Sequence, residues 1–162
     1  MEIKKETPHL FIRLNNYDNF NYIDEHIKCI NEKGYVWMLK MGKTINRNYI
    51  DDVIKSGGGL IIKSSKKDGN QFYYCNIISV DPKAEKELFY PKYYDELFYY
   101  EGYKLETLIE NAYWFKINSI IPINYSIVDK FVVGKNNKKL TNLASETRVV
   151  HMYTKNIDEI AI

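Results

Sequence analysis

The pattern of apolar and polar residues predicts about six short strands. Each is a run of aliphatic, β-branched and aromatic residues bounded by Gly, Pro, Asn or charged residues. The predicted strands cover residues 10–14, 35–39, 60–63, 72–80, 113–122 and 148–153, with a further short candidate at 130–133. Asp68-Gly69 separates the third strand from the fourth and predicts a hairpin, because Gly supplies the positive φ that a tight turn needs.

Apolar residues at helical spacing predict two helices in the first half of the chain, over 21–33 and 48–55. Asn21 is the expected N-cap of the first helix and Gly34 its expected C-cap. The glycine run 57–59 is expected to end the second helix in a tight turn.

The pattern is weaker over residues 82–111. Helices are expected over 83–89 and 104–111, with a Pro-containing loop or a broken helix over 90–94 between them. Because the strands do not alternate regularly with crossover helices, a doubly wound parallel sheet is not expected. The predicted fold class is α+β, a curled mixed sheet or β-barrel flanked by short helices, in a single domain over 1–162.

Composition narrows the choice of partners. The chain has 23 basic and 21 acidic side chains and a net charge of +2, so any nucleic-acid site must be a local basic patch. Its fifteen tyrosines suit half-buried positions and binding surfaces, although an AT-rich genome would also enrich Tyr, Lys, Asn and Ile. Two cysteines are too few for a disulfide framework, and no apolar run has the roughly 20 residues of a membrane helix. A cytoplasmic protein without a membrane partner is expected.

Several residues follow an order known from one family. A strand and a helix precede Trp37, then Arg47-Asn48 opens a short helix, Gly57-Gly58 leads into the next strand, and Trp114 opens a later one. This order resembles the EVE group of PUA-like domains, relatives of the YTH readers, over roughly residues 10–153. The family's Gly-Asp turn is Gly-Gly here, and the chain's ending lacks the family's Pro. The resemblance implies a PUA-like β-barrel whose aromatic pocket binds modified bases or RNA without catalysis.

The residues around Trp37 are the first candidate binding site. An indole stacks well on a base, and Lys40, Lys43, Arg47 and Asn48 would hold a phosphate or a base edge. In the alternative interpretation, Trp37 belongs to the core and the lysines are solvated. Trp114 and a tyrosine such as Tyr93 would complete the stack.

Two further stretches have open interpretations. One stretch contains Lys63 and Ser64, and the other is the basic loop 134–139. Each would either contact a phosphate or form a solvated turn. The aromatic residues of 89–103 form either an exposed binding surface or a second small core.

Catalytic and metal chemistry find little support. Gly42-Lys43-Thr44 lacks the first Gly of a phosphate-binding loop, because Trp37 occupies that position. His26 and Cys29 share a helix face but are only two ligands, and Cys75 lies in an apolar strand. We expect no enzyme activity, no cofactor and no metal.

Two functions are therefore expected. The first is a non-catalytic nucleic-acid-binding module, including a reader of a modified base in DNA or RNA. The alternative is a protein–protein interaction module that binds a host protein, such as a phage-encoded inhibitor of a host nuclease system.

Overall fold

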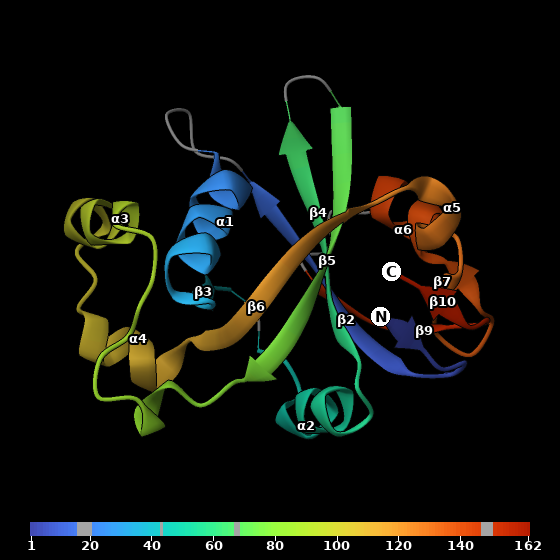
Figure 1. Cartoon of the computed structure of the whole chain (residues 1–162), viewed down its shortest axis with the longest axis horizontal. Helices are drawn as coiled ribbons and strands as arrows, with labels where there is room; N and C mark the ends of the chain where they lie inside the picture. Colours follow the sequence, from blue (N-terminus) through green and yellow to red (C-terminus); the bar gives the residue numbers. More distant parts are fainter. Residues whose placement is uncertain (16–20, 43, 67–68, 147–150) are drawn as a thin grey trace.

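The computed structural model describes residues 1–15, 21–42, 44–66, 69–146 and 151–162. Within them, an eight-stranded mixed sheet has the strand order β3-β6-β5-β4-β2-β9-β7-β8, and a two-stranded sheet pairs β1 with β10 (Figure 1). The strands are β1 (Glu2–Ile3), β2 (Pro8–Asn15), β3 (Val36–Lys40), β4 (Gly59–Lys66), β5 (Gly69–Ser79), β6 (Tyr113–Ile123), β7 (Phe131–Val133), β8 (Lys138–Lys139), β9 (His151–Asn156) and β10 (Ile160–Ala161). The chain is thus α+β, and its sheet is not closed into a barrel.

The helices lie around this sheet. They are α1 (Tyr22–Lys33), α2 (Arg47–Lys55), α3 (Tyr93–Glu101), α4 (Leu105–Asn111), α5 (Tyr125–Val128) and α6 (Leu140–Glu146), with a short 3₁₀ helix at Pro82–Ala84. In Figure 1, α1, α3 and α4 lie at one end of the long axis, and α5 and α6 lie at the other end with both chain termini.

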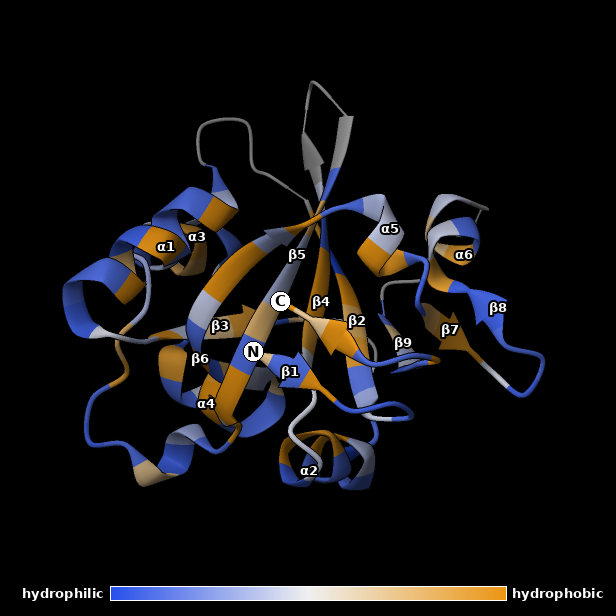
Figure 2. Ribbon diagram, turned by 45° about the vertical axis from the view of Figure 1, so that its right-hand side comes forward, coloured by the Kyte–Doolittle hydropathy of each residue, from blue (hydrophilic) through white to orange (hydrophobic). Residues whose placement is uncertain are grey.

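The central strands contribute to two cores, because successive side chains on a strand point to opposite faces. On β4, Leu60 and Ile62 join the first core, whereas Ile61 joins the second. On β5, Cys75 and Tyr74 divide in the same way. The first core is covered by α1 to α4 and the second by α5, α6 and the β1–β10 pair, and hydrophobic residues run along the strands between them (Figure 2).

Local sequence signals place several of these elements as predicted. The Asn21 side chain accepts a hydrogen bond from the Asp24 backbone N–H, and Gly34 ends α1 with φ +79°. The β4–β5 hairpin is confirmed by its register, in which Lys66 lies opposite Gly69, although Asp68 is outside the described residues.

Other predictions in the middle of the chain are wrong. The stretch 83–89 contains only the end of the 3₁₀ helix, and the helix α3, which begins at Tyr93 within the stretch expected to be a loop or a broken helix, was not predicted beyond residue 94. The strands β1, β8 and β10 and the short helices α5 and α6 were not predicted. The last strand begins at His151 and runs to Asn156, while residues 148–150 of the predicted strand lie outside the described part.

The outer edge of β3 is closed by side-chain and loop contacts. The backbone N–H of Trp37 donates to the Phe89 carbonyl (2.8 Å), and the backbone N–H of Leu39 donates to the Tyr94 hydroxyl (3.1 Å). Two outward N–H groups of this edge strand are therefore unavailable for pairing with another chain. Among the described helices, none is long and apolar enough to cross a membrane.

Candidate functional site: a lysine-lined hollow and a tyrosine–carboxylate surface

The two tryptophans come together in the interior. In the β3–β6 pair, Leu39 lies opposite Trp114 and Trp37 lies opposite Lys116, so both indoles are on the same face of the sheet. Both belong to the first core, with exposed fractions of 0% for Trp37 and 1% for Trp114. The two indoles thus share one core, but neither presents a ring face at the surface for a base to stack on.

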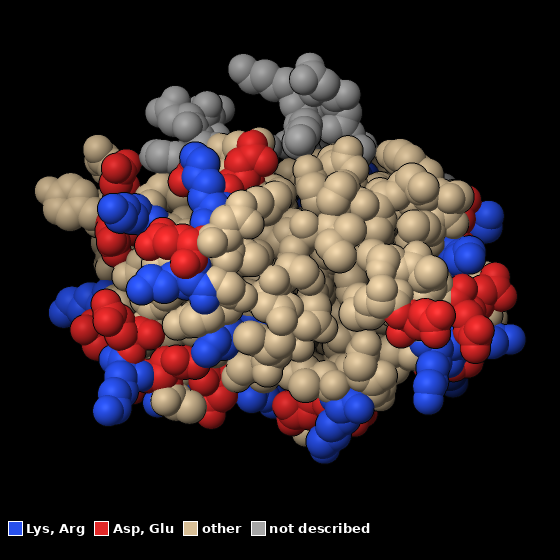
Figure 3. Space-filling view, viewed as in Figure 1, with Lys and Arg blue, Asp and Glu red and all other residues tan. Residues whose placement is uncertain are grey.

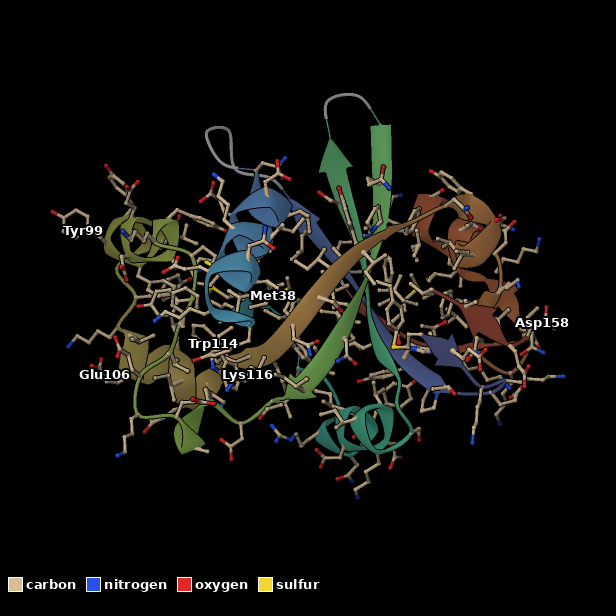
Figure 4. The ribbon with its side chains drawn as sticks, in the orientation of Figure 1. Met38, Tyr99, Glu106, Trp114, Lys116 and Asp158 are labelled. Atoms are coloured by element: carbon tan, nitrogen blue, oxygen red, sulfur yellow. The ribbon has the colours of Figure 1, made fainter. Side chains whose placement is uncertain are left out.

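Neighbouring side chains cover both rings. The Lys116 Nζ lies 5.8 Å from the Trp37 ring centroid and 4.2 Å from that of Tyr35, and it forms an ion pair with the Glu85 carboxylate (2.5 Å). The Trp114 Nε1–H donates to the Leu108 carbonyl (3.0 Å). Figure 4 shows Trp114 between α4 and β6, with Lys116 further along β6.

Beside Trp114, a hollow of about 210 Å³ opens between the end of β3, the start of β6 and α4. Lys40 and Tyr113, which are register partners in the sheet, line one side of it, and Tyr103, Thr107 and Asn111 line the other. Helical spacing explains the second side, because positions 107 and 111 lie on one face of α4. Of the residues predicted for a site, only Lys40 lines this hollow among the described residues.

Lys40 is a buried cation with an exposed fraction of only 4%. Its Nζ donates to the carbonyl of the adjacent Met41, and none of the ion pairs formed by the described residues includes it. Burial lowers the pKa of the Lys40 ammonium, because removing a charge from water disfavours the protonated form. Gly42 lies against the ammonium, since a Cβ built on it would be 3.3 Å from the Nζ.

Arg47 and Asn48 do not line this hollow. Both are exposed on α2, where the Arg47 Nε lies 3.4 Å from the Asp51 carboxylate. Lys43 lies outside the described residues. Arg47 and Asn48 thus belong to a solvated helix face.

Lys63 and Ser64 point inward from β4. The Lys63 Nζ donates to the Ala144 carbonyl in the last turn of α6 (2.7 Å), and Arg13 donates to the same oxygen. Lysine and arginine at a helix C-terminus satisfy carbonyls that the helix leaves without a partner. Lys63 thus has a structural role, and Ser64 is fully buried.

Tyr93 and its neighbour Tyr94 are also interior residues. Their rings lie 5.0 Å apart in a T-shaped arrangement, and the Tyr94 hydroxyl is 2.7 Å from that of Tyr22. The aromatic stretch 89–103 therefore splits, because its first members pack in the first core while its last members are exposed.

The exposed members form part of the binding surface that was one of the two interpretations of this stretch, although the sequence did not indicate the carboxylates that surround them. Tyr99 and Tyr100 at the end of α3 are 84% and 81% exposed, and Tyr103 is 41% exposed. Figure 4 shows Tyr99 at the outer side of α3. Five exposed carboxylates accompany them, on Asp95, Glu96, Glu101, Glu106 and Glu110, and none is in an ion pair within the described part of the chain. We call these eight residues the tyrosine–carboxylate surface.

Two long stretches of the sheet carry no charge. Residues 69–80 and 117–128, which include most of β5 and β6, contain no Lys, Arg, Asp or Glu. Figure 3 shows the resulting uncharged area between charged side chains at the two ends. Because nucleic-acid affinity depends on cations that contact phosphates, this face does not suit nucleic acid.

Among the described residues, no group of three or more His, Cys, Asp or Glu side chains could hold a metal ion. Cys75 is completely buried, and burial raises the pKa of its thiol, which keeps it protonated and unreactive.

Comparison with models of known protein families gives no match, and comparisons with curated proteins and with solved structures give none either. The resemblance to the EVE group stays a prediction, and functional proposals rest on the chemistry of the described residues.

Proposed function

We propose that this chain is a protein–protein interaction module that docks through the tyrosine–carboxylate surface. The observation that carries the proposal is the exposure of two adjacent aromatic side chains, Tyr99 and Tyr100, at the end of a helix. Tyrosine is enriched where partners bind, because it buries a large apolar area with little conformational entropy cost.

The surrounding charge specifies the kind of partner. Residues 93–111 carry five carboxylates and one lysine, although the whole chain has a net charge of +2. Such a surface repels phosphates and complements a basic protein face. A nucleic-acid-binding site of a host nuclease has this chemistry, which supports the inhibitor alternative.

The test is capture from a nuclease-treated host lysate, with a photo-crosslinking residue placed at Tyr100. We expect a crosslink to one protein that survives nuclease treatment, and loss of capture in the double variant Tyr99→Ala/Tyr100→Ala. Glu96→Gln/Glu101→Gln should weaken capture and reduce its dependence on salt.

Tyr125 provides the matched control, because it is 54% exposed on α5 at the other end of the molecule. Tyr125→Ala should capture the partner as the unmodified protein does. Capture that is unaffected by the Tyr99/Tyr100 change would contradict the proposal. Capture that depends on intact nucleic acid would favour the second candidate.

That second candidate is a nucleic-acid-binding module, including a reader of a modified base. Its support is Lys40, a buried cation at a hollow lined by tyrosines. The order β2, α1, β3 with Trp37, α2, β4, β5 supports a PUA-like fold. Its test is binding of modified and unmodified oligonucleotides at low salt, and no detectable binding of either would reject it.

A further inference from the structure

We infer that the Lys40 hollow is a binding site for the phosphate group of a nucleotide-sized ligand. The hollow shares Tyr103 with the tyrosine–carboxylate surface, but the inference does not require a protein partner, because Lys40 and the hollow would bind such a ligand whatever docks on Tyr99 and Tyr100.

The Lys40 ammonium is buried without a counter-ion among the described residues. An ammonium taken out of water is costly unless it is paired, and a buried charge in a protein usually has a counter-ion. Lys40 is 4% exposed, and its hydrogen bond to the Met41 carbonyl uses one of its three donors. Lys40 is one of the residues that line the hollow, so an anion that enters would supply the missing partner.

The hollow is also lined by side chains that carry hydrogen-bond donors. Tyr103 and Thr107 contribute hydroxyl groups, and the Asn111 carboxamide donates to the Thr107 carbonyl (3.0 Å) on the same wall. A lysine binds phosphate as a point charge, and the lining residues include no carboxylate that would compete for the ammonium. Hydroxyl donors together with one ammonium therefore favour a phosphate.

The volume of the hollow also fits a phosphate-bearing ligand. A hollow of about 210 Å³ is far larger than the space that one water molecule needs. That space accepts a phosphate together with part of a flat ring, and the half-exposed Tyr103, which lines the hollow, is an aromatic side chain of the kind on which such rings stack. Glu106 and Glu110 are not among the lining residues and are exposed, so solvent screens their repulsion.

The experiment is calorimetric titration at low salt with AMP, inorganic phosphate, acetate and uncharged adenosine. We expect AMP to bind more tightly than phosphate, and acetate and adenosine to bind more weakly than AMP. Lys40→Met keeps the length of the side chain without its charge, and it should weaken AMP binding at least about tenfold.

Lys104→Met is the matched control, because Lys104 is exposed beside Tyr103 and is not a lining residue. It should leave AMP binding unchanged. Thr107→Val, a shape-conserving change, should weaken AMP binding while the circular dichroism spectrum stays the same, which keeps the test informative if Lys40→Met unfolds the chain.

A 5′-phosphorylated oligonucleotide distinguishes the source of the phosphate. Binding through its end at Lys40 indicates a nucleic-acid ligand, and binding of AMP alone indicates a free nucleotide. The inference is overturned if adenosine binds as well as AMP, if Lys40→Met binds AMP as the unmodified protein does, or if no ligand saturates up to about 10 mM.

Discussion

Tyr94 shows how a single hydroxyl organises the first core. Its oxygen accepts the Leu39 N–H (3.1 Å) and lies 2.7 Å from the Tyr22 hydroxyl and 3.0 Å from His26 Nε2. The His26 Nδ1 faces the Tyr22 carbonyl (2.7 Å), which can only accept, so this nitrogen carries the proton and Nε2 accepts from Tyr94. One hydroxyl therefore links α1, α3 and the edge strand β3.

Tyr94→Phe should lower the free energy of unfolding by about 3 kcal/mol, because buried donors and acceptors left without partners cost ~1–3 kcal/mol each. Urea unfolding followed by circular dichroism measures the change. Tyr99→Phe is the control, since Tyr99 is exposed on the same helix, and it should change stability by less than about 0.5 kcal/mol. Equal effects of the two changes would show that the hydroxyl network contributes nothing.

The sequence does not predict which of the two residues Tyr94 and Tyr99 is buried. They lie five residues apart in one aromatic stretch, yet one is buried and the other is exposed. Both residues are tyrosines with the same helix propensity. Only the packing of α3 against the first core makes one buried and the other exposed. The same holds for Lys40, whose burial no neighbour in the sequence indicates.

At the scale of elements, the turn between α2 and β4 depends on backbone contact. A Cβ on Gly58 would lie 1.9 Å from the Pro8 carbonyl oxygen at the start of β2. The Gly58 N–H donates to the Val53 carbonyl (2.8 Å), and the Gly59 N–H donates to His9 Nδ1 (3.0 Å). The glycine run ends a helix as predicted, but it also brings that turn into contact with β2.

Gly58→Ala should therefore destabilise the protein by about 3 kcal/mol, because the backbone carbonyl that it meets cannot move aside cheaply. Gly57→Ala is the matched control. Gly57 has φ +72° with nothing within 4 Å of an added Cβ, so only the strain of the left-handed conformation remains, at ~1–2 kcal/mol. Chemical denaturation compares the two variants, and a larger loss for Gly57→Ala would refute the close-contact argument.

At the scale of the whole molecule, two buried histidines couple stability to pH. Desolvation lowers the pKa of both His9 and His26 to about 4, against 6.5 for an exposed imidazole. Between pH 6.5 and 4 the unfolded chain binds protons at these sites and the folded chain does not. Stability is therefore complete above pH 6.5 and is lost progressively as the pH falls toward 4.

The free energy of unfolding should decrease by up to about 1.4 kcal/mol per pH unit for each histidine below pH 6.5. Urea titrations at pH 7.5, 6.5, 6 and 5 measure this slope, in a range where few carboxylates titrate. The variant His26→Gln should show about half the slope. A stability that stays constant from pH 7.5 to pH 5 would contradict the burial of the two neutral imidazoles.

The sequence by itself determined the α+β class and those elements that strong local signals mark. Asn21, Gly34 and the turn at 68–69 act on residues within a few positions, so α1 and the β4–β5 hairpin could be predicted. The weak pattern of 82–101 could not resolve α3, because its tyrosines face both the core and the solvent.

Only the tertiary structure decided which side chains are reachable. It buried Trp37 and Trp114 together, sealed the β3 edge, and brought Lys40 to a hollow with residues more than sixty positions away. Burial depends on contacts between distant segments. The sequence around an apolar, aromatic or lysine residue therefore does not show whether its side chain is buried or exposed. The candidate site follows from that packing and from no local motif.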